Sequence, residues 1–138
     1  MKKTERIGMV RRVVDDIERR KAEALAACEK NVRAAQAKLD ELEAYRGAYV
    51  RDFARRAESG MSGAGVREYQ VFLSRLDEAL RQQNQILAQA RLQRGAELES
   101  WRNAARRASA VGNLASHWQA EERYVAEKIE QKESDERS

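Results

Sequence analysis

Apolar residues in the second half of the chain recur every seven positions from Val66 to Ile129. They form two lines offset by three residues, which is the a/d arrangement of a coiled coil. Because 3.6 residues per turn does not divide seven, a heptad kept this long faces one neighbour only if the helices supercoil left-handed. The pattern predicts a long helix that packs on a partner helix. The first line is Val66, Leu73, Leu80, Leu87, Trp101, Ala108 and Ile129, and the second is Tyr69, Leu76, Ala90, Val111, Trp118 and Val125.

The first half of the chain has its apolar residues at steps of mostly three and four, with one slip of register between Cys28 and Val32. This spacing also predicts an amphipathic helix. Its apolar line comprises Ile7, Val10, Val14, Ile17, Ala24, Cys28, Val32, Ala35, Leu39, Leu42, Tyr45, Tyr49 and Phe53.

One break separates the two patterns, at residues 59–65, where three of the seven glycines collect. A glycine here is suited to end the first helix, and Ser62 to cap the second. We therefore predict an all-α fold, a single long antiparallel coiled-coil hairpin over residues 1–138. Its parts are a helix over about 5–58, a turn over about 59–65, a helix over about 66–132 and a frayed tail to 138.

In such a hairpin the numbers of facing residues add to about 123, which places the small Ala24 and Cys28 opposite Leu98 and Trp101. Small residues opposite large ones favour an intramolecular pair over separate parallel dimers, so the isolated protein is expected to be a monomer. The second helix is the longer one. Beyond Trp118 it has no predicted partner, and its remaining apolar residues form a possible docking site.

Composition narrows the function classes. Proline is absent and 36% of residues are charged, as in long solvated helices. No signal peptide and no stretch of about 20 apolar residues is recognisable, so a cytoplasmic protein is expected. One cysteine and one histidine give neither a disulfide nor a metal site. No phosphate-binding loop or catalytic triad is present, and we predict a protein that is not an enzyme and has no cofactor.

Charge is distributed unevenly around a formal net charge of +4. The N-terminal segment is basic, with Arg11, Arg12, Arg19 and Arg20, whereas the segment from Glu121 onward is acidic. The arginine pairs permit contacts with phosphates, but carboxylates lie near each of them. A generic coiled-coil nucleic-acid-binding protein therefore remains an alternative, and no specific nucleic acid is expected.

An apolar patch follows the turn, where Phe72 lies beside the predicted seam. With Tyr69, Leu73 and Leu76 it makes the apolar face wider than two helices need, so part of it is a candidate surface for another protein. The alternative is that Phe72 folds over the seam near Tyr49 and Phe53.

The order and spacing of several motifs resemble the FliJ family, small coiled-coil components of the bacterial flagellar protein export apparatus. They are Ala44-Tyr45 with Tyr49, Met61-Ser62, Tyr69-Gln70 with Phe72, Leu76, Glu78 and Ala79, and Ser100-Trp101-Arg102. The resemblance implies a cytoplasmic hairpin at the inner face of the cell membrane, at the flagellar base, with a part in motility, chemotaxis and type III secretion. It would bind the export ATPase FliI with its regulator FliH in a stalk-like manner.

The resemblance further implies contacts with the export gate FlhA and with export chaperones such as FlgN and FliT. The gate-binding stretch corresponds to Tyr69, Phe72 and Leu76. For the ATPase contact the candidates are Arg11, Arg12, Arg19, Arg20 and Tyr124. The stalk protein of an injectisome type III secretion system is the nearest alternative, because it shares the hairpin and the ATPase partner.

Overall fold

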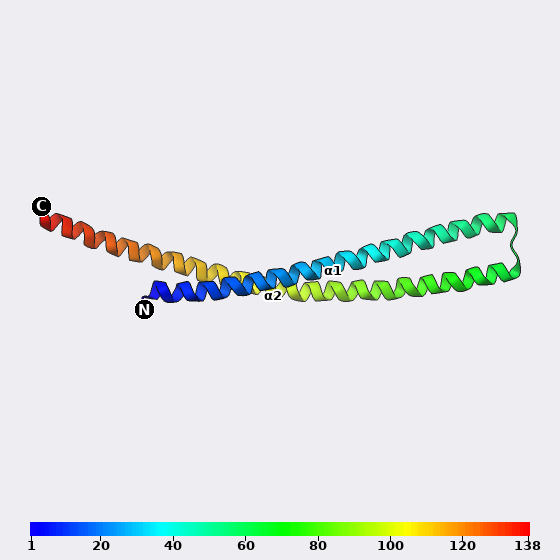
Figure 1. The fold of residues 1–138 in the computed structure, drawn as a ribbon, viewed down its shortest axis with the longest axis horizontal. Coiled ribbons are helices and arrows are strands. Elements are labelled where there is room, and N and C mark those ends of the chain that lie inside the picture. The colour runs from blue at the N-terminus through cyan, green and yellow to red at the C-terminus, as the bar shows by residue number, and fades with distance from the viewer. The chain divides into compact units, whose positions relative to one another are not determined.

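The computed structural model describes residues 1–138 and consists of two helices, α1 (Lys3–Ser59) and α2 (Gly63–Arg137), joined by a short turn (Figure 1). There are no strands. The chain divides into two compact units. Unit 1 comprises Met1–Leu25 with Glu97–Ser138, and unit 2 comprises Ala26–Ala96. Within each unit a part of α1 packs against an antiparallel part of α2, which confirms the all-α two-helix hairpin.

The turn is shorter than predicted, because only residues 60–62 lie between the two helices. Gly60 has a φ of 95°, a left-handed conformation that ends α1. The Ser62 hydroxyl then accepts a hydrogen bond from the Gly65 N–H at 3.0 Å, so Ser62 caps α2 as expected. With this cap in place, residues 63–65 form the first turn of α2 instead of extending the loop.

The C-terminal tail also differs from the prediction. Residues 133–137 were expected to fray, but α2 continues to Arg137. Three of these five residues, Glu133, Glu136 and Arg137, are good helix formers, and no proline or glycine stops the helix.

The core of unit 2 is a thin stripe between the helices. Val32, Ala35 and Leu39 of α1 pack with Leu87 of α2, and Leu80 and Ala90 border them. The Gln83 side chain donates a hydrogen bond from Nε2 to the carbonyl oxygen of Ala35 at 3.0 Å. A shift of one residue would break this cross-helix bond and leave the half-buried Gln83 amide without its partner. Gln83, a polar intrusion into the heptad, thus helps to fix the register.

In unit 1 the buried apolar residues are Ile7 and Val14 of α1 and Ala115 of α2. Ala115 lies seven residues after Ala108, on the first heptad line. Lys2 pairs with Glu122 at 3.1 Å in this unit, and in unit 2 Arg46 pairs with Asp77 at 2.6 Å. The residue numbers of these pairs add to 124 and 123, which agrees with the predicted sum of about 123. The prediction that Trp101 lies opposite Cys28 is wrong, because the Trp101 indole donates a hydrogen bond to Glu18 at 2.9 Å.

Five residues of the predicted seam are exposed instead of covered, namely Val10, Ile17, Tyr45, Val125 and Ile129. Val10, Ile17 and Tyr45 flank the contact, and a pair of helices covers only a narrow stripe of each. Val125 and Ile129 lie farther along α2 than Glu121 and Glu122, the residues that meet the start of α1. The uncovered end of α2 therefore begins several residues later than the predicted Trp118, and beyond Ala126 no part of α1 lies beside α2 (Figure 1).

Candidate partner-binding surfaces

The three predicted gate contacts lie on α2 in unit 2 but differ in exposure. Leu76 is buried in the seam between the helices. Tyr69 and Phe72 are half-buried. The structure therefore does not bring the three side chains together on one open surface, because the heptad position of Leu76 turns it toward α1.

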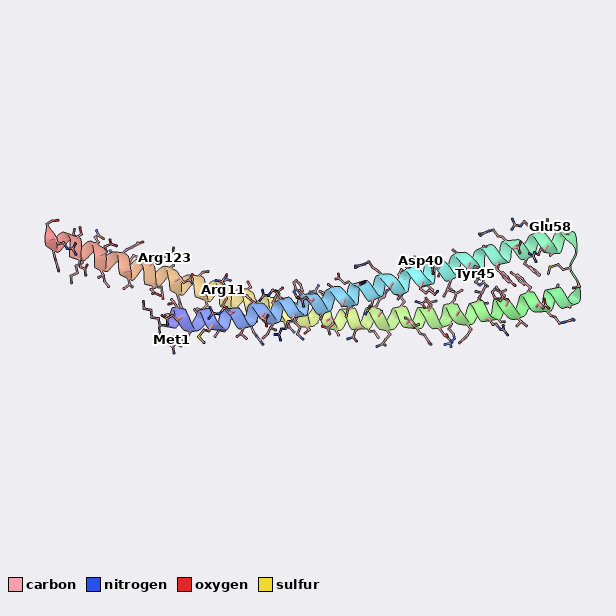
Figure 2. The ribbon with its side chains drawn as sticks, in the orientation of Figure 1. Met1, Arg11, Asp40, Tyr45, Glu58 and Arg123 are labelled. Atoms are coloured by element: carbon pink, nitrogen blue, oxygen red, sulfur yellow. The ribbon has the colours of Figure 1, made fainter.

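Five aromatic side chains form a cluster across the two helices of unit 2. One of them, Tyr45 on α1, is labelled in Figure 2. The Tyr69 ring stacks on Tyr49 at a centroid distance of 4.5 Å and on Phe53 at 3.8 Å. Phe72 lies 4.6 Å from Tyr49 and 6.1 Å from Tyr45. Phe72 therefore folds over the seam beside Tyr49, as the alternative interpretation predicted. The predicted neighbour Phe53 stacks on Tyr69 instead of Phe72. We call these five residues, Tyr45, Tyr49, Phe53, Tyr69 and Phe72, the aromatic cluster.

The hydroxyl of Tyr69 is buried and has no hydrogen-bond partner. Burial raises the pKa of this phenol, with a further contribution from Tyr49, because the charged phenolate is disfavoured away from water. The side chain remains neutral and acts in packing. Nothing in the heptad pattern signals this unpaired group, since the pattern records only that Tyr69 faces the seam.

Open surface lies beside the aromatic cluster, on the outer side of α2. A shallow depression there is bordered by Val71 and by one side of Phe72, and Val71 is exposed. Val71 falls on neither heptad line, so the search for seam residues missed it. The complete lining is Ala64, Arg67, Glu68, Val71, Phe72 and Arg75.

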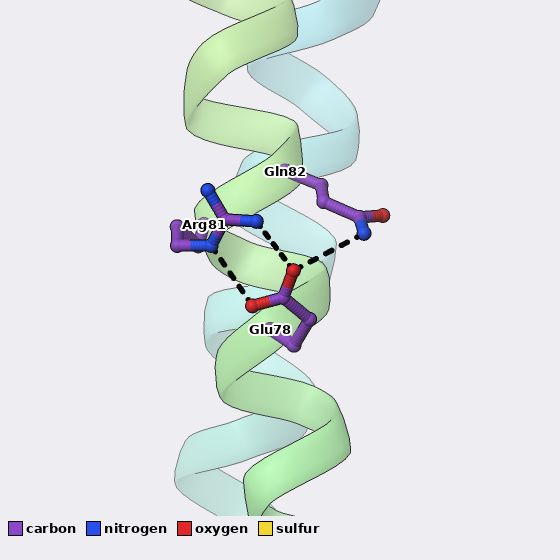
Figure 3. Close-up of polar contacts among 3 residues, drawn as sticks. All are labelled: Glu78, Arg81 and Gln82. Carbon is purple, nitrogen blue, oxygen red and sulfur yellow. Dashed lines mark hydrogen bonds and ion pairs between the residues drawn. The ribbon is translucent and has the colours of Figure 1, made fainter.

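Two polar arrangements follow the aromatic cluster along α2. The Arg46 guanidinium of α1 bonds Asp77, which raises the pKa of Arg46. At the next residue, Glu78 accepts hydrogen bonds from Arg81 at 2.5 and 2.8 Å and from Gln82 at 3.2 Å (Figure 3). The hydrogen bonds from Arg81 lower the pKa of the Glu78 carboxyl. All these groups are exposed, so they stabilise the helices only slightly and form no enclosed site.

The four arginines predicted to contact the ATPase lie on α1 in unit 1. Arg19 and Arg20 both pair with Asp16, at 3.6 and 3.0 Å. The Arg11 side chain lies 4.0 Å from Asp15 and beside Gly112 of α2. Arg12 makes no ion pair. Neighbouring carboxylates therefore neutralise part of the predicted basic surface.

The start of α1 is fastened to α2 by charged groups. Lys3 lies 4.5 Å from the centre of the Trp118 ring and pairs with Glu121 at 3.5 Å. Hydrogen bonds from Thr4 and Lys2 lower the pKa of the Glu122 carboxyl. Farther along α2, Tyr124 is exposed, with the Lys128 ammonium 5.6 Å from its ring centre. Of the predicted ATPase contacts, Arg12 and Tyr124 are the most available.

No group of three or more histidine, cysteine, aspartate or glutamate side chains is arranged to hold a metal ion. Neither helix contains a segment long and apolar enough to span a membrane.

Comparison with known proteins gives one family. The family model described as flagellar FliJ protein matches residues 2–138. No curated protein and no solved structure matches the chain.

Proposed function

Because the chain belongs to the FliJ family and is thus a flagellar export-related protein, we propose that it acts as a non-enzymatic adaptor. In this role it binds the export ATPase FliI with its regulator FliH and links them to the export gate FlhA. The observation that carries the proposal is the family match over residues 2–138. The surfaces of the two units support it, because both leave apolar side chains uncovered.

For the gate contact we propose Phe72 as the side chain that touches FlhA, since it borders the open depression on α2. Leu76 is buried and Tyr69 is held between two rings of the aromatic cluster. Their proposed part is to hold Phe72 in place from the seam side.

For the ATPase contact we propose the end of unit 1, with Arg12 and Tyr124 as its most accessible members. Arg11, Arg19 and Arg20 would contribute after exchanging their present carboxylate neighbours for groups on the ATPase. Breaking the present ion pairs costs little free energy, because exposed ion pairs contribute little to stability. Chaperones such as FlgN and FliT are further proposed partners, and the proposed location is the cytoplasm at the flagellar base.

The first test measures the ATPase contact. Titrating the full chain into FliI with FliH at physiological salt is expected to change the rate of ATP hydrolysis and to give a complex that co-elutes. An Arg12→Glu, Tyr124→Ala double variant should weaken both effects. If the unmodified chain neither co-elutes nor changes the rate, the adaptor proposal is wrong.

The second test measures the gate contact. Phe72→Ala is expected to weaken FlhA binding at least about fivefold, as truncation of an interface aromatic does, and to leave the helical circular dichroism signal unchanged. Ile86→Ala, an exposed residue on the same helix, is the matched control and should bind normally. A joint loss of helicity and binding in Phe72→Ala would show that Phe72 only stabilises the fold.

A further inference from the structure

Unit 1 carries an exposed apolar face that none of the proposed contacts uses. On α1, Val10, Val13 and Ile17 are exposed by 46%, 59% and 37%. Their spacing of three and four residues puts them on one side of the helix. Three aliphatic side chains exposed in consecutive turns mark a surface suited to a partner.

The second helix contributes to the same face. A depression between the helices is bordered by Ile17 and Lys21 of α1 and by Arg107 of α2. Leu114 lies seven residues after Arg107 and is 40% exposed, so it continues the α2 border of the depression. Val10 lies seven residues before Ile17 and continues the α1 border. We call the surface formed by Val10, Val13, Ile17, Lys21, Arg107 and Leu114 the unit 1 face.

The charged residues that line the depression have one sign. Lys21 and Arg107 border the depression, one from each helix, and neither takes part in an ion pair. The rest of the depression is lined by Val14, Ser100, Asn103 and Ala104, so no carboxylate borders it. An apolar surface with two unpaired cations at its edges is complementary to an apolar segment with acidic edges.

We propose that the unit 1 face binds an amphipathic helix of a partner protein, apolar along its centre and acidic along its edges. A helix is the expected partner element, because Val10, Val13 and Ile17 are spaced by three and four residues and form an apolar stripe along α1. A third helix can pack along such a stripe. A second copy of this chain placed face to face fits poorly, because the two interfaces would together hold four cations, Lys21 and Arg107 from each copy, and no carboxylate from the depression. The inference goes beyond the proposed function, because its residues are neither the gate contacts nor the ATPase contacts.

The probe for the test is a fluorescein-labelled peptide of about 20 residues with leucine at heptad positions a and d and glutamate at e and g. Its control is the same peptide with lysine at e and g. Fluorescence anisotropy against the full chain is expected to show binding of the glutamate peptide at least about tenfold tighter than that of the lysine peptide, because the edges of the face are basic.

Variants locate the site. Val13→Asp and Ile17→Asp should each weaken the glutamate peptide at least about tenfold, because a charge would be placed in the apolar contact. Lys21→Glu with Arg107→Glu should reverse the preference toward the lysine peptide. Val50→Asp is the matched control, since Val50 is an exposed valine on α1 in unit 2 that borders none of the proposed surfaces, and it should bind as the unmodified chain does. Circular dichroism checks that each variant is helical.

Three results would overturn the inference. The first is equal binding of the two peptides, or no binding at about 100 µM, a concentration at which even a weak helix–groove contact is detected. The second is a dimer in sedimentation that Val13→Asp abolishes, which would assign the face to self-association. The third is Val13-dependent pelleting with phosphatidylserine vesicles without peptide binding. Because the peptide assay contains neither ATPase nor gate, its outcome is independent of the proposed function.

Discussion

A residue of the seam either packs between the two helices or lies open to a partner protein, and Tyr69 and Leu76 illustrate the difference. The heptad pattern correctly placed both toward the partner helix, and the same residues resemble a gate-binding stretch in the family. A side chain that fills the seam cannot also lie open to a partner, so burial decides against direct contact for Leu76. The sequence could not reveal this, because the width of the covered stripe depends on how closely the two helices approach.

Tyr69→Phe tests the cost of the unpaired hydroxyl. The oxygen is buried without a hydrogen-bond partner, so its removal should leave the free energy of unfolding unchanged or raise it by up to about 1 kcal/mol. Urea unfolding followed by circular dichroism measures the effect, with Tyr45→Phe, at an exposed residue, as the control. A loss of stability beyond about 1 kcal/mol would mean that the hydroxyl makes a stabilising hydrogen bond.

At the scale of the elements, the sequence predicted the existence, type and register of both helices, and it missed their ends. The existence follows from long periodic patterns, which are strong signals. The ends depend on single capping contacts. Three glycines suggested a seven-residue turn, yet the bond from Gly65 to Ser62 places Gly63 and Gly65 in the helix and leaves only Gly60 with a positive φ.

Two glycine substitutions should therefore have opposite effects. Gly60→Ala puts a Cβ on a residue with a φ of 95° and should lower the free energy of unfolding by about 1 kcal/mol. Gly95→Ala, inside α2 with no atom within 4 Å of the added Cβ, should raise it by about 1 kcal/mol. Chemical denaturation of the two variants beside the unmodified chain measures the difference. Stabilisation by Gly60→Ala would show that residue 60 does not need a left-handed conformation to end α1.

For the whole molecule, the contacts group into two units, and each unit has a thin stripe of buried apolar residues instead of a central core. The heptad lines alone suggested one continuous hairpin. They could not indicate the division, since a periodic pattern records which side of a helix is apolar and not how contacts group along it. Each unit therefore has its own set of buried residues and its own set of exposed ones.

Amide hydrogen exchange followed by mass spectrometry should distinguish covered from uncovered segments within each unit by their exchange rates. Residues 127–137 have exposed side chains and no neighbouring helix, so their amides should exchange fastest within unit 1. Amides near Leu39 and Leu87, in the stripe of unit 2, should exchange most slowly within that unit. Slow exchange throughout residues 127–137 in the isolated chain would show that another copy of the chain covers this segment.

Both ends of the chain belong to unit 1, because Met1 and Ser138 lie in the segments that compose it. A fluorescent protein or affinity tag fused to either terminus would therefore be attached to the unit that carries the proposed ATPase contact and the unit 1 face. Residues 60–62 offer a different attachment point, an exposed or half-exposed turn in unit 2 held only by local hydrogen bonds. A small epitope inserted between Gly60 and Ser62 leaves unit 1 free of any label, and is therefore the label to use when the proposed ATPase contact or the unit 1 face is measured.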